Sequence, residues 1–352
     1  MNQHAPSITG IGSVTPFGPL AGLIPPSPLD PTVITGWPTK GPRRAFLVDR
    51  FNPASVVPGL KTRRLDRLSA WALVASSLAL RDAGIDLQQV DHSRVAVVFA
   101  TGFGCIDLTA SFFQSAFNNT WSGTDPITFP ETLANSPAGH IALVNDFRGP
   151  NITISSKHFA AESALLQAAS LLRHGQADLA IVIAGDTLTQ AIYEWYGTAR
   201  LLSPACYASQ PASESSGFIP SEGVVAVVLE PCGKRVPRCY ARLHTGRWAS
   251  AGDPRQSIRE ILSNAIPSLM IAAGNGAPCS KSSPKWEIAG LVAPRAQILP
   301  AQSVALGLTD TGALLHLVLA LSKKPDPGHA LMLATSGDTG FAALLLELPN
   351  SS

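Results

Sequence analysis

Near-continuous apolar runs alternate with amphipathic stretches through the first two thirds of the chain. Residues 94–101 and 177–186 are almost wholly apolar, which is typical of strands buried on both faces of a sheet. Residues 160–174 repeat Ala and Leu at the spacing of one helix face. By the same reasoning, further strands are predicted at 7–11, 149–155 and 222–231, and further helices at 63–84 and 132–147. This alternation predicts a layered α/β fold around a buried sheet.

The last third of the chain repeats the alternation and predicts a second unit. The sequence favours helices at 256–274 and 311–323, and strands at 287–294, 329–337 and 341–348. Residues 233–248 are interpreted as the join between the two units. We therefore expect a duplicated architecture with an N-terminal half over 1–235 and a shorter C-terminal half over 236–352.

Composition narrows the classes of function. The 352 residues are 45% hydrophobic and 14% charged, with a formal net charge of +2. No run of Lys or Arg is present, so neither nucleic acid nor an anionic membrane surface is the expected partner. No apolar run reaches the length of a membrane span, and the N-terminus lacks a basic region followed by a long apolar stretch. We expect a cytoplasmic protein without a membrane span.

The cysteines indicate reduced thiols. Their number is odd and no two are separated by only two residues, which argues against a disulfide framework and a zinc site. The expectation is therefore that the protein needs no metal and no cofactor. The five positions are Cys105, Cys206, Cys232, Cys239 and Cys279.

Five blocks of sequence follow one another over residues 8–231. They are ITGIGSVTPFG, RRLDRLSAWALVASSLALRDAGID, RVAVVFATGFG, FPETLANSPAGHIALVNDFRGPNITIS and GFIPSEGVVAVVLEP. Together they resemble the β-ketoacyl synthases, the condensing enzymes of fatty acid and polyketide synthesis. The resemblance implies a thiolase-like fold of five layers, α-β-α-β-α, built from two similar βαβ halves. It also implies that the N-terminal half, 1–235, forms a dimer face.

The resemblance also locates the positions of the family's catalytic groups. In that family a cysteine at a helix start is the nucleophile, because the helix N-terminus lowers the pKa of the thiol. Here His158 stands at that position, preceded by Lys157. Leu306 stands where one catalytic histidine is expected, and the stretch IAGLVAPRAQILP, where the other belongs, has no histidine. Asp338 and Thr339 replace a gating Phe and Gly. The loss of all three catalytic groups implies that the chain does not condense acyl chains by itself.

His158 has more than one interpretation. Because His158 and Glu162 are four residues apart, they would share one face of a helix. They could form a dyad in which the carboxylate orients the imidazole, which then acts as base or nucleophile on an acyl thioester. Alternatively, Lys157, His158, Phe159 and Glu162 form a polar plug where an acyl chain would turn. Metal binding by His158 and Glu162 is a third interpretation, for which the sequence offers no third ligand.

The leading hypothesis is a non-catalytic ketosynthase-like subunit of the chain-length-factor type. Such a subunit forms a heterodimer with an active ketosynthase in polyketide, aryl-polyene or fatty-acid-like chain elongation and shapes the cavity in which the chain grows. The residues expected to line or block this cavity are Lys157, His158, Phe159, Glu162, Leu306, Asp338 and Thr339. The alternatives are an acyltransferase or thioesterase-like enzyme using His158 with Glu162, and a protein that only binds an acyl group or an acyl carrier protein.

Several other residues are assigned structural roles, and for some of them two interpretations stay open. The basic residues Arg63, Arg64 and Arg67 would either meet an acidic carrier protein or form a solvated helix end. The remaining assignments are a buried structural thiol at Cys105, helix packing at His140, a helix-end cation at His174, a structural hydrogen-bonding carboxylate at Glu222, and packing or surface at His316.

Overall fold

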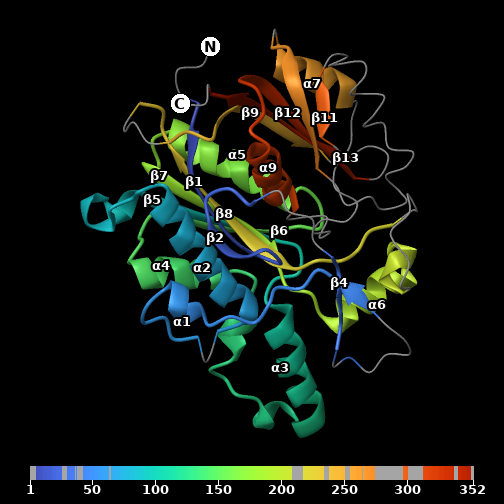
Figure 1. Ribbon diagram of the computed structural model, residues 1–352. Helices are drawn as coiled ribbons and strands as arrows, with labels where there is room; N and C mark the ends of the chain where they lie inside the picture. The colour runs from blue at the N-terminus through green and yellow to red at the C-terminus, as the bar shows by residue number, and fades with distance from the viewer. Residues whose placement is uncertain are drawn as a thin grey trace.

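The computed structural model describes most of the chain (Figure 1). The described residues are 5–25, 30–35, 37, 43–62, 65–207, 217–233, 238–249, 254–263, 265–273, 296–299, 312–336 and 340–349. None of the helices in these ranges is both long enough and apolar enough to cross a membrane.

Among the described residues, eleven strands form one hydrogen-bonded sheet in the order β11-β10-β12-β13-β9-β1-β8-β7-β5-β6, with β2 paired to β1. The strands β5, β6 and β7 are parallel, as are β10, β11 and β12, and the other pairs are antiparallel. Their bounds are β1 Ser7–Thr15, β2 Gly18–Ala21, β5 Val95–Thr101, β6 Asn151–Ser155, β7 Leu179–Asp186, β8 Gly223–Glu230, β9 Ala241–Ala249, β10 Pro267–Ala273, β11 Gln297–Leu299, β12 Gly328–Ser336 and β13 Gly340–Leu348. A separate pair is formed by β3 Thr32–Val33 and β4 Arg44–Ala45.

The helices cover both faces of this sheet. Their bounds are α1 Pro53–Val56, α2 Arg67–Asp82, α3 Ile106–Asn119, α4 Ser136–Asn145, α5 Ala160–Arg173, α6 Gln190–Thr198, α7 Pro254–Leu262 and α9 Gly312–Ser322. Short 3₁₀ turns lie at Leu87–Gln89, His92–Arg94, Trp121–Gly123 (η3), Phe129–Thr132 (η4) and Pro204–Cys206.

The sheet divides into two halves at the junction of β1 and β9. Strand β1 pairs with β8 along nearly its whole length but with β9 only at Ser7 and Ile8. Helix α5 packs on β5 and β7 of one half and on β9 and β13 of the other, with α9 beside it (Figure 1). Helices α2 and α4 cover the outer face of the first half, and α7 covers that of the second. The result is the expected five-layered α-β-α-β-α fold, which is confirmed.

The apolar pattern of the sequence fills the interfaces between these layers. Ala161, Ala164, Leu165 and Ala168 of α5 are buried in the central layer, because they recur on the faces that the two half-sheets cover. Small residues let α2 approach β1 closely. A Cβ atom at Gly12 would collide with the backbone oxygen of Ala75. The glycines of the ITGIGS stretch are therefore required by helix–sheet packing.

The structure adds a strand to the predicted join and corrects the sequence-based assignment of the second half. The predicted join at 233–248 contains β9, which connects the half-sheets. The helix predicted at 256–274 is wrong beyond Leu262, because Pro267–Ala273 is the parallel strand β10. The strand predicted at 287–294 lies outside the described residues, and the division of the chain at 235 stays a prediction.

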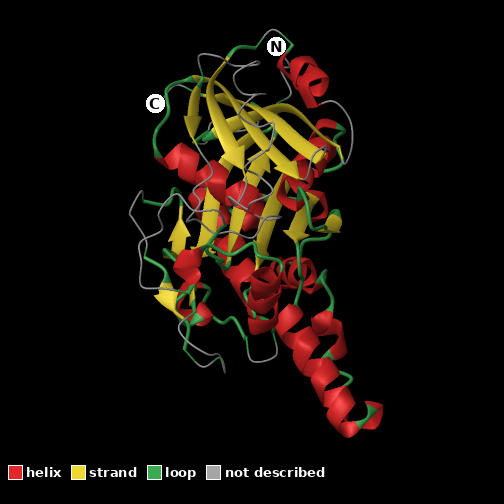
Figure 2. Ribbon diagram, turned by 90° about the vertical axis from the view of Figure 1, so that its right-hand side faces the viewer, coloured by secondary structure: helices red, strands yellow, loops and turns green. Residues whose placement is uncertain are grey.

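Among the described helices, α1, α3 and α6 were absent from the sequence-based assignment. Helix α3 lies in what the pattern left as a polar loop, and it projects from the lowest part of the molecule in both views (Figure 1, Figure 2). Helix α6 follows β7 and carries an aromatic-rich sequence.

Candidate functional site

The candidate site is the turn between β6 and α5. The backbone N–H of His158 donates to the Ser156 hydroxyl at 3.3 Å, and that hydroxyl donates to the His158 carbonyl at 2.9 Å. Phe159 then adopts a left-handed conformation, φ 58° and ψ 27°, immediately before the first helical residue. A bulky residue in this conformation costs about 1 kcal/mol, so it persists only where the surroundings hold it. Here burial holds Phe159, whose exposed fraction is 6%.

His158 and Glu162 lie in different environments. The His158 side chain is exposed, whereas Glu162, in the first turn of α5, is 3% exposed. Partial burial lowers the pKa of the His158 imidazole, so the ring is neutral at pH 7. Because α5 begins at Ala160, His158 precedes the helix, and the four-residue helical spacing does not by itself bring the two side chains together. The dyad stays a prediction.

Lys157 reaches across to the loop that follows β5. Its ammonium group donates a hydrogen bond to the carbonyl of Gly102 and lies 3.2 Å from the centroid of the Phe103 ring. Phe103 in turn packs edge-on against Tyr196, which packs edge-on against Phe218. The cation therefore caps one end of an aromatic row, an arrangement stabilised by the negative face of the ring.

Asp186 holds the same loop by hydrogen bonds, and the sequence analysis missed it. Its carboxylate is fully buried and accepts hydrogen bonds from the Thr101 hydroxyl at 2.6 Å and from the backbone N–H groups of Gly102 and Phe103 at 3.0 and 2.8 Å. The Thr101 hydroxyl also accepts from the N–H of Gly104. An acid closing the apolar run of a buried strand was the available signal, since a carboxylate there needs several donors.

Three of the predicted cavity residues cannot be placed around this turn. Leu306, Asp338 and Thr339 lie outside the described residues. Lys157, His158 and Phe159 lie in the turn before α5 and Glu162 in the first turn of α5, and their assignment to a cavity stays a prediction. Within the described part of the chain, no three or more His, Cys, Asp or Glu side chains gather as they would around a metal ion.

Comparison of the chain with models of known protein families identifies the family to which it belongs. Residues 22–234, more than half of the chain, match the model of the β-ketoacyl synthase N-terminal domain. The chain belongs to the β-ketoacyl synthase family.

Individual relatives agree with this assignment. The 3-oxoacyl-[acyl-carrier-protein] synthase 2 of Vibrio cholerae is 24% identical over 245 residues, which cover 65% of this chain and 58% of that protein. The chain thus spans somewhat more than half the length of this relative. The ishigamide ketosynthase/chain length factor structure is 20% identical, with a TM-score of 0.75 and coverage of 98% of this chain and 99% of that one. A type II polyketide ketosynthase in complex with its acyl carrier protein, AntDE:AntF, is 16% identical with a TM-score of 0.75, over 98% and 99% of the two chains. These structures share the fold.

Cys105 has the structural role expected of it in this β-ketoacyl synthase-family chain. The side chain is 1% exposed at the start of α3, with its sulfur 3.9 Å from the hydroxyl oxygen of Ser69. Burial raises the pKa of the thiol to about 12, with the nearby Asp66 carboxylate adding to the effect. A thiol of this kind stays protonated and is a poor nucleophile, so Cys105 does not replace the missing cysteine.

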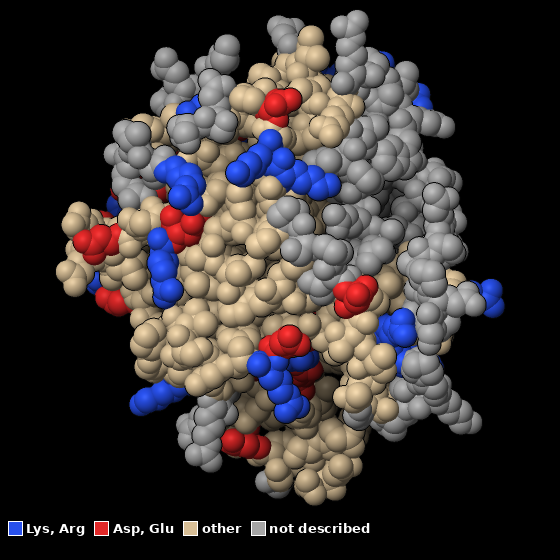
Figure 3. Space-filling view, in the orientation of Figure 1, with Lys and Arg blue, Asp and Glu red and all other residues tan. Residues whose placement is uncertain are grey.

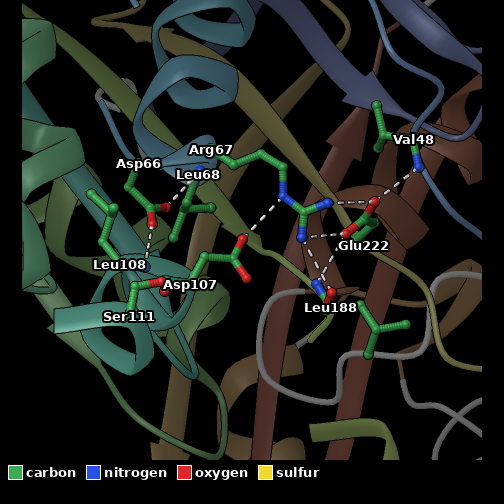
Figure 4. A network of polar contacts seen from close by, with 9 residues as sticks. All are labelled: Val48, Asp66, Arg67, Leu68, Asp107, Leu108, Ser111, Leu188 and Glu222. Atoms are coloured by element: carbon green, nitrogen blue, oxygen red, sulfur yellow. Dashed lines mark hydrogen bonds and ion pairs between the residues drawn. The ribbon is translucent and has the colours of Figure 1, made fainter. Parts of the chain in front are cut away.

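The Arg67 side chain is neither a free basic group nor simply solvated (Figure 4). Its guanidinium bonds the carboxylates of Glu222 and Asp107 and the carbonyl of Leu188. Glu222 also accepts from the backbone N–H groups of Val48 and Leu188, so its expected structural role is confirmed. Arg63 and Arg64 lie outside the described residues.

The histidines His140, His174 and His316 have structural surroundings. His140 bonds Glu131 at 2.6 Å, which corrects the expectation of packing alone. His174 caps the C-terminal end of α5, as expected at a helix end. His316 is buried in α9, which agrees with a packing role.

Proposed function

We propose that this chain is a non-catalytic subunit that pairs with an active β-ketoacyl synthase in polyketide, aryl-polyene or fatty-acid-like chain elongation. The observation that carries the proposal is the occupancy of the strand-to-helix turn. At the position where the family has a thiol, this turn carries the exposed imidazole of His158. The preceding residue, Lys157, contacts Gly102 and Phe103. An imidazole at this position leaves no cysteine to hold a growing chain as a thioester, so condensation would have to take place on a partner.

A large exposed apolar surface supports pairing. We call residues 106–133, which comprise α3, η3 and η4, the α3 arm. Large apolar side chains that protein interiors normally bury are exposed along it, with Phe117 85% and Trp121 67% exposed, and with Phe113, Ile127, Phe129 and Leu133 also exposed. The arm contains no Lys or Arg, so its polar groups are neutral or acidic. An apolar patch of this extent on a monomer marks an interaction site.

This surface continues toward an open sheet edge. Strand β6 is the last strand in the order of the described sheet, and η4 packs on α4, which packs on β6. Leu143 and Val144 of α4 are also exposed. An edge strand offers unpaired backbone groups that a second sheet can extend. A second chain of the same fold, which would present the same kind of edge and apolar arm, is therefore the proposed occupant.

On the described part of the face shown in Figure 3, no field of one charge sign is present. Acidic and basic side chains are interspersed over the face shown in Figure 3, with wide uncharged regions between them. A nucleic acid would require a field of one sign. The two neighbouring structures described above are a ketosynthase/chain length factor and a ketosynthase with its acyl carrier protein, and they support the choice of ketosynthase and carrier protein as partners.

The pairing is tested by co-purification with a ketosynthase that retains the cysteine and both histidines and is encoded beside this chain. We expect a 1:1 complex by analytical ultracentrifugation. Phe117→Asp should abolish it, because the charge would be buried without a partner. Trp195→Asp is the matched control, since Trp195 is 57% exposed on α6, outside the arm. Failure of the unaltered chain to bind the ketosynthase would overturn the proposal.

A second candidate function is acyl transfer or thioester hydrolysis by His158. It is favoured by the neutrality of the His158 imidazole at pH 7 and by the buried Glu162 carboxylate four residues later. Turnover of acyl thioesters by the isolated chain, abolished by His158→Ala, would establish this function in place of the first.

A further inference from the structure

The loop Thr101–Gly104 joins the candidate site to the α3 arm. It leaves the end of β5, where Ser156 donates its backbone N–H to the Thr101 carbonyl, and it leads directly into α3 at Ile106. The loop therefore has the 156–159 turn on one side and the start of the arm on the other.

Most backbone polar groups of the loop Thr101–Gly104 form hydrogen bonds. Asp186 accepts the N–H groups of Gly102 and Phe103, and the Thr101 hydroxyl accepts that of Gly104. The Gly102 carbonyl accepts from Lys157, whose ammonium also covers the Phe103 ring. Asp186 belongs to the buried sheet, whereas Lys157 comes from the turn where the family has its nucleophile. Both are charged groups bound to neutral ones, and charge-assisted hydrogen bonds are about twice as strong as neutral ones.

At the start of the arm, Phe103 and Ile106 pack against the apolar core and Cys105 is buried. The N-cap position of α3 is Cys105, whose side chain makes no capping hydrogen bond. One turn later, Asp66 accepts the N–H of Leu108 and Arg67 bonds Asp107, which fixes the arm to the start of α2. The direction of the arm is thus set at two places, by α2 and by the loop that Lys157 and Asp186 hold.

We propose that Lys157 is a positioning residue for the α3 arm, so that the turn which once carried a nucleophile now anchors the surface that meets the partner. This inference rests on the pairing proposed above. Lys157 acts through Gly102 and Phe103 and does not itself need to touch the partner.

The test compares Lys157→Met with Lys157→Arg, and uses Lys323→Met, an exposed lysine at the end of α9, as the matched control. Amide hydrogen exchange over residues 102–119 is measured on the full chain alone. We expect Lys157→Met to speed exchange roughly tenfold there, at an unchanged melting temperature, and Lys157→Arg to restore protection, because a guanidinium can also bond the carbonyl and stack on the ring. Unchanged exchange in Lys157→Met would overturn the inference.

Affinity for the ketosynthase separates this inference from the pairing itself. Lys157→Met should raise the dissociation constant for the ketosynthase roughly tenfold. Lys157→Arg and Lys323→Met should keep it within about threefold of the value for the unaltered chain. If Lys157→Met speeds exchange but the unaltered chain binds no ketosynthase, pairing fails and the positioning role stands. If the unaltered chain binds and Lys157→Met binds equally well, the positioning role in docking fails and pairing stands.

Discussion

Arg67 and Glu222 form an ion pair, with 3.2 Å between a guanidinium nitrogen and a carboxylate oxygen, in which the carboxylate is 1% exposed and the arginine side chain 40% exposed. Burial raises the pKa of the Glu222 carboxyl, and Arg67 opposes that shift. The pair joins the start of α2 to the segments around Val48 and Leu188. These segments are far apart in the sequence. The same guanidinium also bonds Asp107 in the first turn of α3, so the network contacts the start of the α3 arm (Figure 4).

Removing Arg67 should destabilise the folded chain, because the buried Glu222 carboxylate then lacks its cationic partner. Arg67→Met is expected to lower the free energy of unfolding by about 2 kcal/mol at pH 7, less than for a fully buried pair because solvent screens the half-exposed guanidinium. The loss should shrink as pH falls, because burial raises the pKa of the Glu222 carboxyl and the variant lacks the arginine that opposes that shift. Urea unfolding at pH 7 and at lower pH measures both effects. In the Glu222→Gln background the same substitution should cost much less, and an equal cost there would contradict coupling between the two side chains.

Asp66 should make the folded state less stable as pH rises. Burial raises the pKa of this carboxyl to about 6, although it accepts hydrogen bonds from the N–H groups of Leu68 and Leu108. The folded chain keeps the proton up to about pH 6, whereas the unfolded chain releases it near 3.8. The favourable contribution is therefore complete below pH 3.8 and is lost as pH rises through 6.

The substitution Asp66→Asn isolates this contribution. Between pH 4 and pH 7, the stability of the unaltered chain relative to Asp66→Asn should fall by about 2 kcal/mol. Urea unfolding at several pH values gives this difference directly. A difference that is independent of pH would show that Asp66 titrates as an ordinary carboxyl.

The described thiols should differ sharply in reactivity. Cys232 is exposed, whereas Cys105 and Cys206 are buried and burial raises their pKa values to about 12 and about 11. With iodoacetamide at pH 8, followed by peptide mass spectrometry, we expect rapid modification of Cys232 and none of Cys105 or Cys206 before unfolding. Fast modification of Cys105 in the folded chain would revive it as a candidate nucleophile.

Asp186 should be required for stability, because it holds the loop at the candidate site. Asp186→Ala leaves the N–H groups of Gly102 and Phe103 and the Thr101 hydroxyl without this acceptor. We expect a loss of about 3 kcal/mol or more in the free energy of unfolding. Asp186→Asn, which keeps an acceptor, should lose less. A loss below 1 kcal/mol in Asp186→Ala would contradict the anchoring role.

The sequence predicts the elements whose residues face the core. The run 94–101 and the helix 160–174 match β5 and α5 to within a residue, since their apolar spacing reports burial directly. Strand β10 was mistaken for helix because Pro267–Ala273 is a short apolar run continuous with a helical pattern, where periodicity does not separate the two. Helix α3 was missed because several of its large apolar residues, Phe113 and Phe117 among them, face solvent, so no core-facing stripe marks it.

The candidate site was predictable as a position but not as a set of contacts. Family resemblance places His158 and Lys157 in a strand-to-helix turn, and the structure shows that turn with Phe159 in a left-handed conformation. The contact of Lys157 with Gly102 and Phe103 joins residues more than fifty positions apart. No local pattern encodes such a contact, because it depends on β5 and β6 lying side by side in the sheet. The position of Asp186 at the end of an apolar strand was a local signal, but its contacts with Thr101, Gly102 and Phe103 are likewise distant in sequence.

The most direct test of the central claim is the turnover of a complex reconstituted from the active ketosynthase and this chain carrying His158→Ala. Malonyl- and acyl-carrier-protein thioesters serve as substrates, with the unaltered complex and each isolated chain as references. The proposed role predicts that the His158→Ala complex condenses within about twofold of the unaltered complex, because no catalytic step uses the imidazole. Loss of turnover in the His158→Ala complex, with the complex still formed, would contradict a non-catalytic role for this chain.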